Sequence, residues 1–310
     1  MEEKNSESGV GASSENSVNG GNNESSGSMF SITPMSTKMM LKGGDVYEGV
    51  LKVFTPVNME GDFHYKVDVA PYNVTGTDYE ADLTKQTNRS QIMNWITIDE
   101  PKGVLGPNET REIHYTVTVP EDAPGGGQYA VILVGSDEEE TAASDGMLVQ
   151  NVYEMASVLY AQVSGDIKRD GKIELNEVPG FITTTPMWVK VQLENNGNIH
   201  ESAKIDISVK NFLNGAQVYP SDGEEGWLEE VIMPETTRVA TREIKEMPAL
   251  GIYEVTQSVD YMGEHSSVTQ IVVACPIWFM IMVAVVIGII VAGIVMSVRK
   301  HKKKKALKSF

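Results

Sequence analysis

The chain has 310 residues, 41% of them hydrophobic, and a formal net charge of −18 at pH 7. This length accommodates about two ordinary domains of roughly 150 residues each, with enough apolar residues for buried cores. The single cysteine, Cys275, excludes an intrachain disulfide framework. The acidic balance argues against nucleic acid as a partner, because acidic surfaces repel phosphates.

Residues 1–28 are rich in Ser, Asn, Gly and Glu. A segment of this composition cannot bury enough apolar surface to offset the entropy lost on ordering. The sequence therefore predicts a disordered tail over 1–28.

Residues 29–137 carry strict alternation of apolar and polar residues. Phe63, Tyr65 and Val67 alternate with polar residues, and the same period-two pattern runs from Ile113 to Val119. Such runs predict strands with one packed and one solvated face, and turn clusters such as Gly125-Gly126-Gly127 separate them. We predict a first, outer β-sandwich over 29–137.

An acidic, small-residue stretch, SDEEETAASDG, follows from Ser136 to Gly146. We expect a solvated loop or linker over 138–149. The stretch either ends the first domain or interrupts a pair of strands, and the sequence leaves both open.

Residues 150–274 resume the alternation, for example from Val189 to Leu193 and from Ile205 to Val209. Short strands with regular turns and no long amphipathic helix indicate a second, membrane-proximal sandwich. The predicted fold class is all-β: two tandem immunoglobulin-like β-sandwiches followed by one transmembrane α-helix.

A possible metal loop lies at 166–177, DIKRDGKIELNE. Asp166, Asp170 and Glu177 match the EF-hand pattern, but Lys168 places a cation where an oxygen ligand belongs. Asp170-Gly171 equally suits a tight hairpin turn. We therefore predict no metal and no cofactor, with Asp166, Asp170 and Glu177 as weak calcium candidates.

Residues 277–298 contain no charged residue and match the ~30 Å hydrocarbon core of a bilayer. Trp278 lies at the outer end, where interfacial aromatics are expected. Small residues recur every four positions, a spacing that permits close helix pairing as well as ordinary use in a membrane span. They are Ala284, Gly288 and Ala292.

Seven of the 25 basic residues fall within 299–310, beginning with Arg299 and Lys300, and the rest of the chain has a balance of −25. The positive-inside rule predicts a cytoplasmic tail over 299–310 and a large extracellular N-terminal region. No secretory signal is recognisable after Met1, so we expect that a leader was removed or that the start lies upstream. A tail-anchored protein with a cytoplasmic body is the rival, which the basic end disfavours.

Several segments carry a resemblance to a known family: FSITP (30–34), LKVFTP (51–56), WITI (95–98), LGPNETREIHYTVTVPEDAPGGGQYAVILVG (105–135), VQLENNGNIH (191–200) and VIMPETTR (231–238). With the helix and the basic end, they resemble the bacterial WxL-interacting proteins of Gram-positive-type envelopes. The resemblance covers the architecture of 30–305 and scattered motifs in sequence. It implies that the outer sandwich binds peptidoglycan and that the membrane-proximal one binds surface proteins carrying WxL modules.

No catalytic set emerges from the sequence. Cys275 has no visible base, and the five histidines lack metal-ligand spacing, although His64 and His114 could meet if their strands pair. An enzyme would have to draw its acids from distant loops, with 137–140 (DEEE) as first suspects.

The sequence thus favours a noncatalytic surface anchor or adhesin of the cell membrane, whose expected partners are peptidoglycan, other surface proteins and the lipid bilayer. The alternative is an accessory or chaperone for surface-protein assembly that works by strand addition. The ligand-binding residues are unknown. Trp95 could grip glycan or belong to the core.

Overall fold

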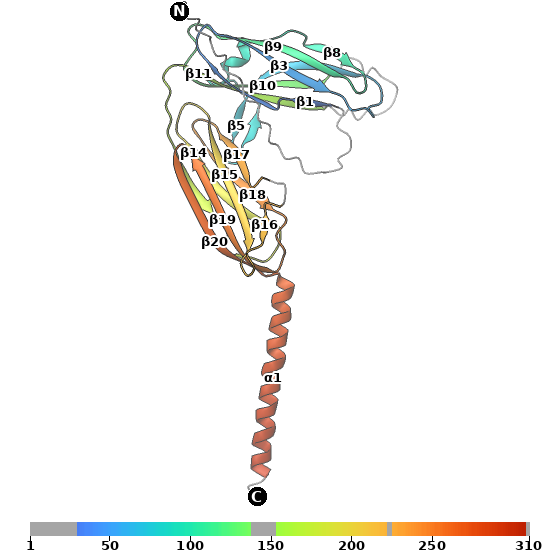
Figure 1. Ribbon diagram of the computed structural model, residues 1–310, viewed down its shortest axis with the longest axis vertical. Coiled ribbons are helices and arrows are strands. Elements are labelled where there is room, and N and C mark those ends of the chain that lie inside the picture. Colours follow the sequence, from blue (N-terminus) through green and yellow to red (C-terminus); the bar gives the residue numbers. More distant parts are fainter. Residues whose placement is uncertain (1–29, 138–152, 222–224, 308–310) are drawn as a thin grey trace, which may run out of the picture. The chain divides into compact units, whose positions relative to one another are not determined.

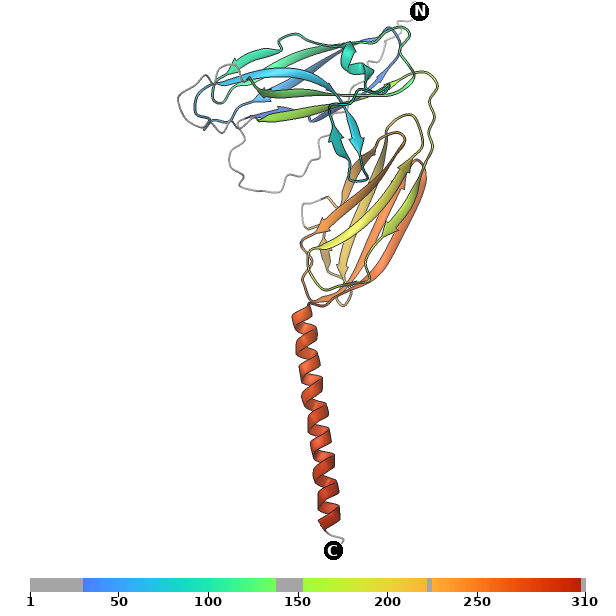
Figure 2. The same ribbon diagram turned by 180° about the vertical axis from the view of Figure 1, so that it is seen from behind.

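The computed structural model describes residues 30–137, 153–221 and 225–307. These form two compact units. The first extends to Arg169 and includes the loop Gly197–His200, and the second contains Asp170–Asn196 and the chain from Glu201 onward. Each unit contains two layers of strands (Figure 1; Figure 2 gives the reverse view).

The first unit contains two sheets and a small hairpin. Four strands form one sheet, in the order β1 (Ser31–Thr33), β3 (Val46–Phe54), β9 (Thr110–Thr118) and β7 (Ile96–Ile98). Five form the other, in the order β2 (Ser36–Leu41), β11 (Glu154–Val163), β10 (Gly126–Ser136), β4 (Phe63–Pro71) and β8 (Lys102–Leu105). The hairpin joins β5 (Asn73–Thr75) to β6 (Glu80–Asp82), and the 3-10 helix η1 (Gln91–Trp95) precedes β7.

The alternation in sequence becomes the core of this sandwich. Phe63 and Tyr65 on β4 are buried, as are Ile113 and Tyr115 on β9. Phe30 stacks on Phe63 with ring centroids 4.5 Å apart. Gly49 on β3 lies beneath the Tyr115 ring, and a Cβ there would come within 2.1 Å of the ring.

The second unit also has two sheets. The smaller contains β12 (Gly171–Glu177), β14 (Met187–Asn195) and β18 (Thr236–Ile244). The larger runs in the order β13 (Phe181–Ile182), β20 (Glu264–Ala274), β19 (Gly251–Tyr261), β15 (Glu201–Asn211) and β16 (Gln217–Tyr219), with β17 (Trp227–Ile232) also paired to β15. Apolar residues of β14 and β15 fill the space between the sheets: Val189, Val191, Leu193, Ile205, Ile207 and Val209.

The helix α1 (Ile277–Leu307) follows the last strand after two residues. Within it, Ile277–Ser297 has a mean hydropathy of 3.0 and none of it is buried, so among the described residues this helix is long and apolar enough to cross a membrane. The predicted fold class is confirmed: two immunoglobulin-like β-sandwiches precede one apolar helix. The helix continues past 298, so the expected tail is helical as far as Leu307.

The predicted border between the sandwiches was wrong. The sequence predicts that the second domain starts at 150, but β11 pairs with both β10 and β2 and so belongs to the first sandwich. The acidic stretch therefore interrupts a strand pair instead of ending a domain, because β10 and β11 are antiparallel neighbours on either side of it. The predicted loop 138–149 and the predicted tail 1–28 lie outside the described residues.

Candidate binding cleft in the second sandwich

The two sheets of the second sandwich come together differently along their two sides. On one side β12 of the smaller sheet approaches β20 of the larger one. On the other side β18 approaches β17. Among the described strands β18 forms a ladder with β14 and β17 with β15, and no ladder joins β17 to β18.

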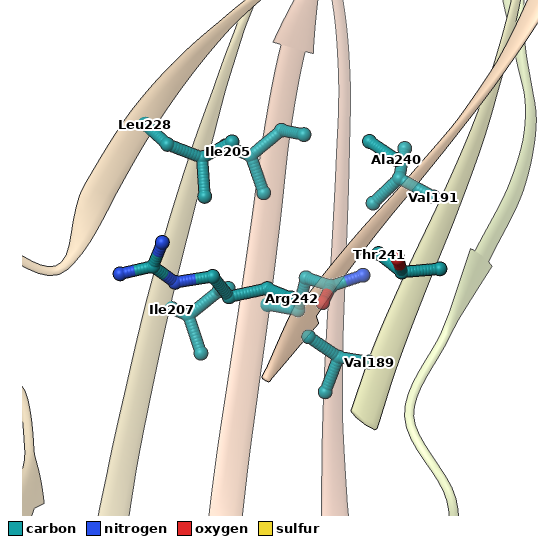
Figure 3. A pocket seen from close by; sticks show the side chains of 9 residues that line it. Val189, Val191, Ile205, Ile207, Leu228, Ala240, Thr241 and Arg242 are labelled. Carbon is teal, nitrogen blue, oxygen red and sulfur yellow. The ribbon is translucent and has the colours of Figure 1, made fainter. Parts of the chain in front are cut away.

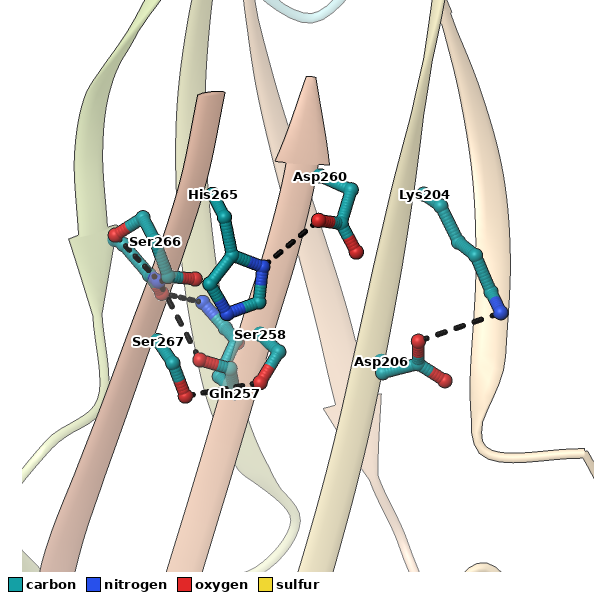
Figure 4. A network of polar contacts seen from close by, with 9 residues as sticks. Lys204, Asp206, Gln257, Ser258, Asp260, His265, Ser266 and Ser267 are labelled. Carbon is teal, nitrogen blue, oxygen red and sulfur yellow. Dashed lines mark hydrogen bonds and ion pairs between the residues drawn. The ribbon is translucent and has the colours of Figure 1, made fainter. Parts of the chain in front are cut away.

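A network of neutral amides seals the β12/β20 side (Figure 4). Asn176 on β12 donates from Nδ2 to the backbone oxygen of Ser266 at 3.1 Å, and Gln257 on β19 donates from Nε2 to Asn176 Oδ1 at 2.7 Å. Gln257 also donates to the backbone oxygen of Lys190 on β14 at 3.2 Å, and it is fully buried. Both sheets are thus hydrogen-bonded to one another on this side.

The β17/β18 side contains an apolar cleft instead (Figure 3). Side chains of both sheets line it: Val189, Val191, Ile205, Ile207, Leu228, Ala240, Thr241, Arg242 and Gln257. The free space within it is about 10 Å³, room for about one water molecule. The cleft is therefore too small for a free small molecule, whose pockets usually enclose about 300–1,000 Å³, and a side chain can enter only where the lining side chains move apart.

One buried polar atom in the cleft wall has no partner. Gln257 Oε1 accepts no hydrogen bond from the part of the chain that the structure describes, although its amide nitrogen is held by two oxygens. Those two bonds fix which end of the amide is the oxygen. A buried acceptor without a partner costs about 1–3 kcal/mol, and a donor entering the cleft would remove that cost.

Two arginines of β18 reach across the opening. Arg238 forms an ion pair with Glu230 of β17 at 2.5 Å and donates to the backbone oxygen of Val231 at 2.6 Å. Arg242 donates to the hydroxyl of Tyr219 on β16 at 3.3 Å. Burial raises the pKa of the Glu230 carboxyl, and the positive charges of Arg238 and Arg242 oppose that rise.

The alternation of β18 explains this arrangement. Arg238, Ala240, Arg242 and Ile244 occupy alternate positions and so share the face of β18 that points toward the sandwich interior. Inward-pointing charges on an edge strand discourage indiscriminate pairing with other strands. The cleft is therefore lined by apolar side chains, and the charged side chains of Arg238, Glu230 and Arg242 lie at its entrance.

The outer face of the larger sheet carries a polar row that superficially suggests catalysis (Figure 4). His265 Nδ1 lies 2.7 Å from Asp260 Oδ1, and Ser258 and Ser267 share a hydrogen bond of 2.9 Å. The described hydrogen bonds of His265 include none to a serine. Both members of the His265–Asp260 pair are more than half exposed, so the row lacks the buried base and activated nucleophile of a catalytic triad.

The weak calcium candidates do not form a loop around an ion. Glu177 ends β12 and pairs with Lys190 in an extended ladder. The hairpin alternative was also wrong, because β12 starts at Gly171 and pairs with β14. No group of three His, Cys, Asp or Glu side chains capable of holding a metal ion occurs within the described ranges.

Other residues singled out in the sequence have structural surroundings. His64 lies on β4 and His114 on β9, in different sheets of the first sandwich, so their strands do not pair. Asp137 forms an ion pair with Lys102 at 2.9 Å, while the acids at 138–140 lie outside the described residues. Trp95 packs against the core of the first sandwich, in line with a core role.

The predicted anchor residues all lie on α1. Trp278 is exposed near its start, and Ala284, Gly288 and Ala292 lie along its exposed middle. Arg299 and Lys300 fall in the part of α1 that continues beyond the apolar span. Whether the small residues pair two helices stays a prediction.

Sequence reasoning missed the residues of the cleft. Arg238 and Arg242 interrupt the apolar alternation of a strand, which was a detectable signal of an edge. Gln257 and Asn176 gave none, because their pairing joins strands about eighty residues apart. His200, also missed, contacts Tyr129 in the first unit, and its pKa is lowered to about 4 by burial and, secondarily, by the charge of Lys38.

No family model matches the chain, and no curated protein matches it. Solved structures with a similar fold include the class 5 fimbriae chaperone CfaA, at 13% identity and a TM-score of 0.38, covering 79% of this chain and 99% of that one. A second is the CsuC-CsuE chaperone–tip adhesion subunit complex of Acinetobacter baumannii, at 12% identity and a TM-score of 0.36, covering 78% and 98%. The CupB2 chaperone of Pseudomonas aeruginosa matches at 11% identity and a TM-score of 0.33, covering 76% and 97%. At these TM-scores the matches carry no argument about function.

Proposed function

We propose that the chain is a membrane-anchored, noncatalytic binding protein whose second sandwich takes up an extended segment of another surface protein along the β17/β18 cleft. The observation that carries this proposal is the apolar cleft itself, with the buried and unpartnered Gln257 Oε1 in its wall. This is the strand-addition alternative of the sequence analysis.

An added strand would provide both main-chain hydrogen bonds for β18 and side chains for the cleft. Among the described strands β18 forms a ladder with β14 alone, so a partner strand could pair along the other edge of β18 over Val239–Ile244. A partner strand added there would gain main-chain hydrogen bonds, and its alternate side chains would point into the groove. The preferred occupant is an apolar side chain flanked by a hydrogen-bond donor for Gln257 Oε1.

The charges at the entrance supply selectivity. Arg242 is exposed and bonded to a neutral hydroxyl, so a carboxylate on the partner can replace that bond with a charge-assisted one. Segments that are basic beside the inserted residue would meet Arg238 and Arg242 and be rejected. We infer a partner segment with alternating apolar residues and at least one acid.

The helix supplies the anchor. The proposed topology is a single pass with the sandwiches outside and the basic end in the cytoplasm, which follows from the positive-inside rule. The resemblance to WxL-interacting proteins implies a surface-protein partner for the second sandwich, in agreement with this proposal. Its other implication, peptidoglycan binding by the first sandwich, is a second and separate proposal that the core position of Trp95 does not support.

Site-specific photo-crosslinking in the native membrane tests the proposal. A benzophenone side chain at Thr241, on the strand β18 that a partner would join, should capture one discrete partner, whereas the same group at Thr256, half-buried on the outer face of the larger sheet, should not. Ala240→Leu fills the cleft and should abolish capture from Thr241. Equal capture from both positions, or capture that survives Ala240→Leu, would show that the cleft is not the site.

A further inference from the structure

The end of the second sandwich that leads into α1 is unusually apolar. Large side chains are exposed there that would normally be buried or replaced by polar turn residues: Phe181 (51% exposed), Phe212 (48%), Leu213 (79%), Leu250 (46%), Ile271 (46%) and Val273 (37%). An exposed apolar cluster on a folded domain marks a surface that another phase or molecule covers.

The register of the strands places these residues at one level. Phe181 pairs with Val273, and Val273 pairs with Ile252, the second residue of β19 after Leu250. The backbone nitrogen of Phe212 donates to the oxygen of Ile252 at 2.9 Å. Four neighbouring chain segments therefore place apolar residues at the same end of the larger sheet, where its strands begin or finish.

Charge is absent from the same four segments. The stretches 178–189, 211–221, 247–253 and 266–298 contain no Asp, Glu, Lys or Arg, in a chain of which 22% is charged. The opposite end of β20 carries Glu264 and His265 instead. Polar hairpin turns are the rule in soluble sandwiches, so this end of the domain carries little charge, with Lys245 and Glu246 before Met247 as the charged residues of the β18–β19 turn.

Chain connectivity identifies what covers this surface. Ala274 ends β20 and Ile277 begins α1. The three residue steps from Ala274 to Ile277 span at most about 11 Å. The Cys275 nitrogen donates to the oxygen of Ile182 at 2.9 Å, which fixes the start of this joint to the sandwich. If α1 crosses a bilayer, the apolar end must lie at the bilayer surface, whatever the tilt of the helix.

We propose that this end of the second sandwich is a lipid-contacting surface, in which Phe212 and Leu213 of the β15–β16 turn, with Phe181 and Leu250, insert among the headgroups and upper acyl chains. Aromatic and aliphatic side chains favour that interfacial zone. An acidic turn would be repelled by anionic lipid. The β15–β16 turn carries no acid, and Glu246 of the β18–β19 turn follows the basic Lys245. The sandwich thus rests on the membrane instead of swinging freely on a linker. This inference rests on the membrane anchoring in the proposed function.

The test uses the full chain in liposomes of phosphatidylcholine and phosphatidylglycerol, with Cys275→Ser removing the native thiol. Leu213→Cys and, as a control in the same sandwich, His265→Cys each receive an environment-sensitive fluorophore. His265 lies eight residues from Val273 along β20, about 26 Å at 3.3 Å per residue. The label at 213 should shift to shorter wavelengths and be quenched by lipids that carry a nitroxide near the headgroup, whereas the label at 265 should show neither effect.

The outcomes separate the two ideas. If the chain fails to float with the liposomes, the anchoring proposal fails. If it floats but the label at 213 behaves as the label at 265 does, the lipid-contacting surface is wrong and the anchor stands. A blue shift at 213 that grows with protein-to-lipid ratio and resists the nitroxide lipids would assign the surface to a second copy of the chain, which also overturns the inference. Phe212→Ser combined with Leu213→Cys should weaken the quenching.

Discussion

The β12/β20 side of the second sandwich is sealed by neutral amides, whereas the β17/β18 side is spanned by charged side chains over an apolar cleft. On the sealed side Asn176 and Gln257 hydrogen-bond one sheet to the other in a buried setting. On the open side the Arg238–Glu230 pair and Arg242 connect side chains that are partly in water. A buried amide that loses its partner is costly, and so is a break in the largely buried Arg238–Glu230 pair, whereas the exposed Arg242 is easily resolvated. One side therefore holds the fold together, and the other can exchange its contacts for those of a partner.

The largest loss of stability is expected from a substitution that breaks the amide network on the β12/β20 side. Asn176→Leu removes its bonds to Ser266 and Gln257 and leaves buried oxygen and amide groups without partners, which should lower the free energy of unfolding by about 2–3 kcal/mol. Arg242→Met on the open side, which keeps the apolar stem, should cost less than about 1 kcal/mol. Hydrogen-exchange protection of β19 and β20 amides measures both. Equal losses in the two variants would erase the distinction between the sides.

A matched pair of alanines sharpens the comparison. Ala203 on β15 is completely buried in the packed interior, and Ala240 on β18 lines the cleft. Ala203→Val should overpack the core and cost about 1–3 kcal/mol. Ala240→Val adds methyl groups beside the cleft, where the lining side chains can move toward the opening, so its cost in unfolding free energy should be smaller than that of Ala203→Val. Chemical denaturation followed by fluorescence of the second sandwich distinguishes the two, and an equal cost at both sites would mean that the cleft is closed in solution.

Much of the fold could be predicted from sequence, and the cleft could not. Alternation from Ile205 to Val209 gave the strands, and the uncharged run from 277 gave the helix, because both signals are local. The predicted domain border at 150 was wrong because the sequence of β11 contains no local signal that this strand pairs with β2 and β10. The cleft depends on which edges approach one another, a consequence of topology, so Gln257 looked like any polar residue on a half-exposed strand.

A pH titration tests the charge at the cleft entrance. Burial raises the pKa of Glu230 above its ordinary value of 4.5, so the folded state holds this proton to a higher pH than the unfolded state does. Stability should therefore fall as the pH rises from about 4.5 through the raised pKa, and then level off. Glu230→Gln should remove this fall, because the amide does not titrate in this range.

Thermal unfolding between pH 4 and pH 8 measures the effect, with Glu229→Gln as the control at the exposed neighbouring position. The control should keep the parent's pH dependence. A parent stability that instead rises between pH 4.5 and 6, and loses that rise in Glu230→Gln, would mean that the Arg238 pair outweighs burial at this site.

The smallest effect is expected on the outer face, where charge lies in water. His265 and Asp260 are 2.7 Å apart but 59% and 58% exposed, so solvent and salt screen their attraction. Asp260→Asn should change the unfolding free energy by no more than about 0.5 kcal/mol, because exposed ion pairs rarely contribute more. It should also leave partner capture from Thr241 intact, since the outer face is separated from the cleft by the larger sheet. Thermal unfolding at low and high salt together with the crosslinking assay tests this, and a loss of capture in Asp260→Asn would move the binding surface from the cleft to the outer face.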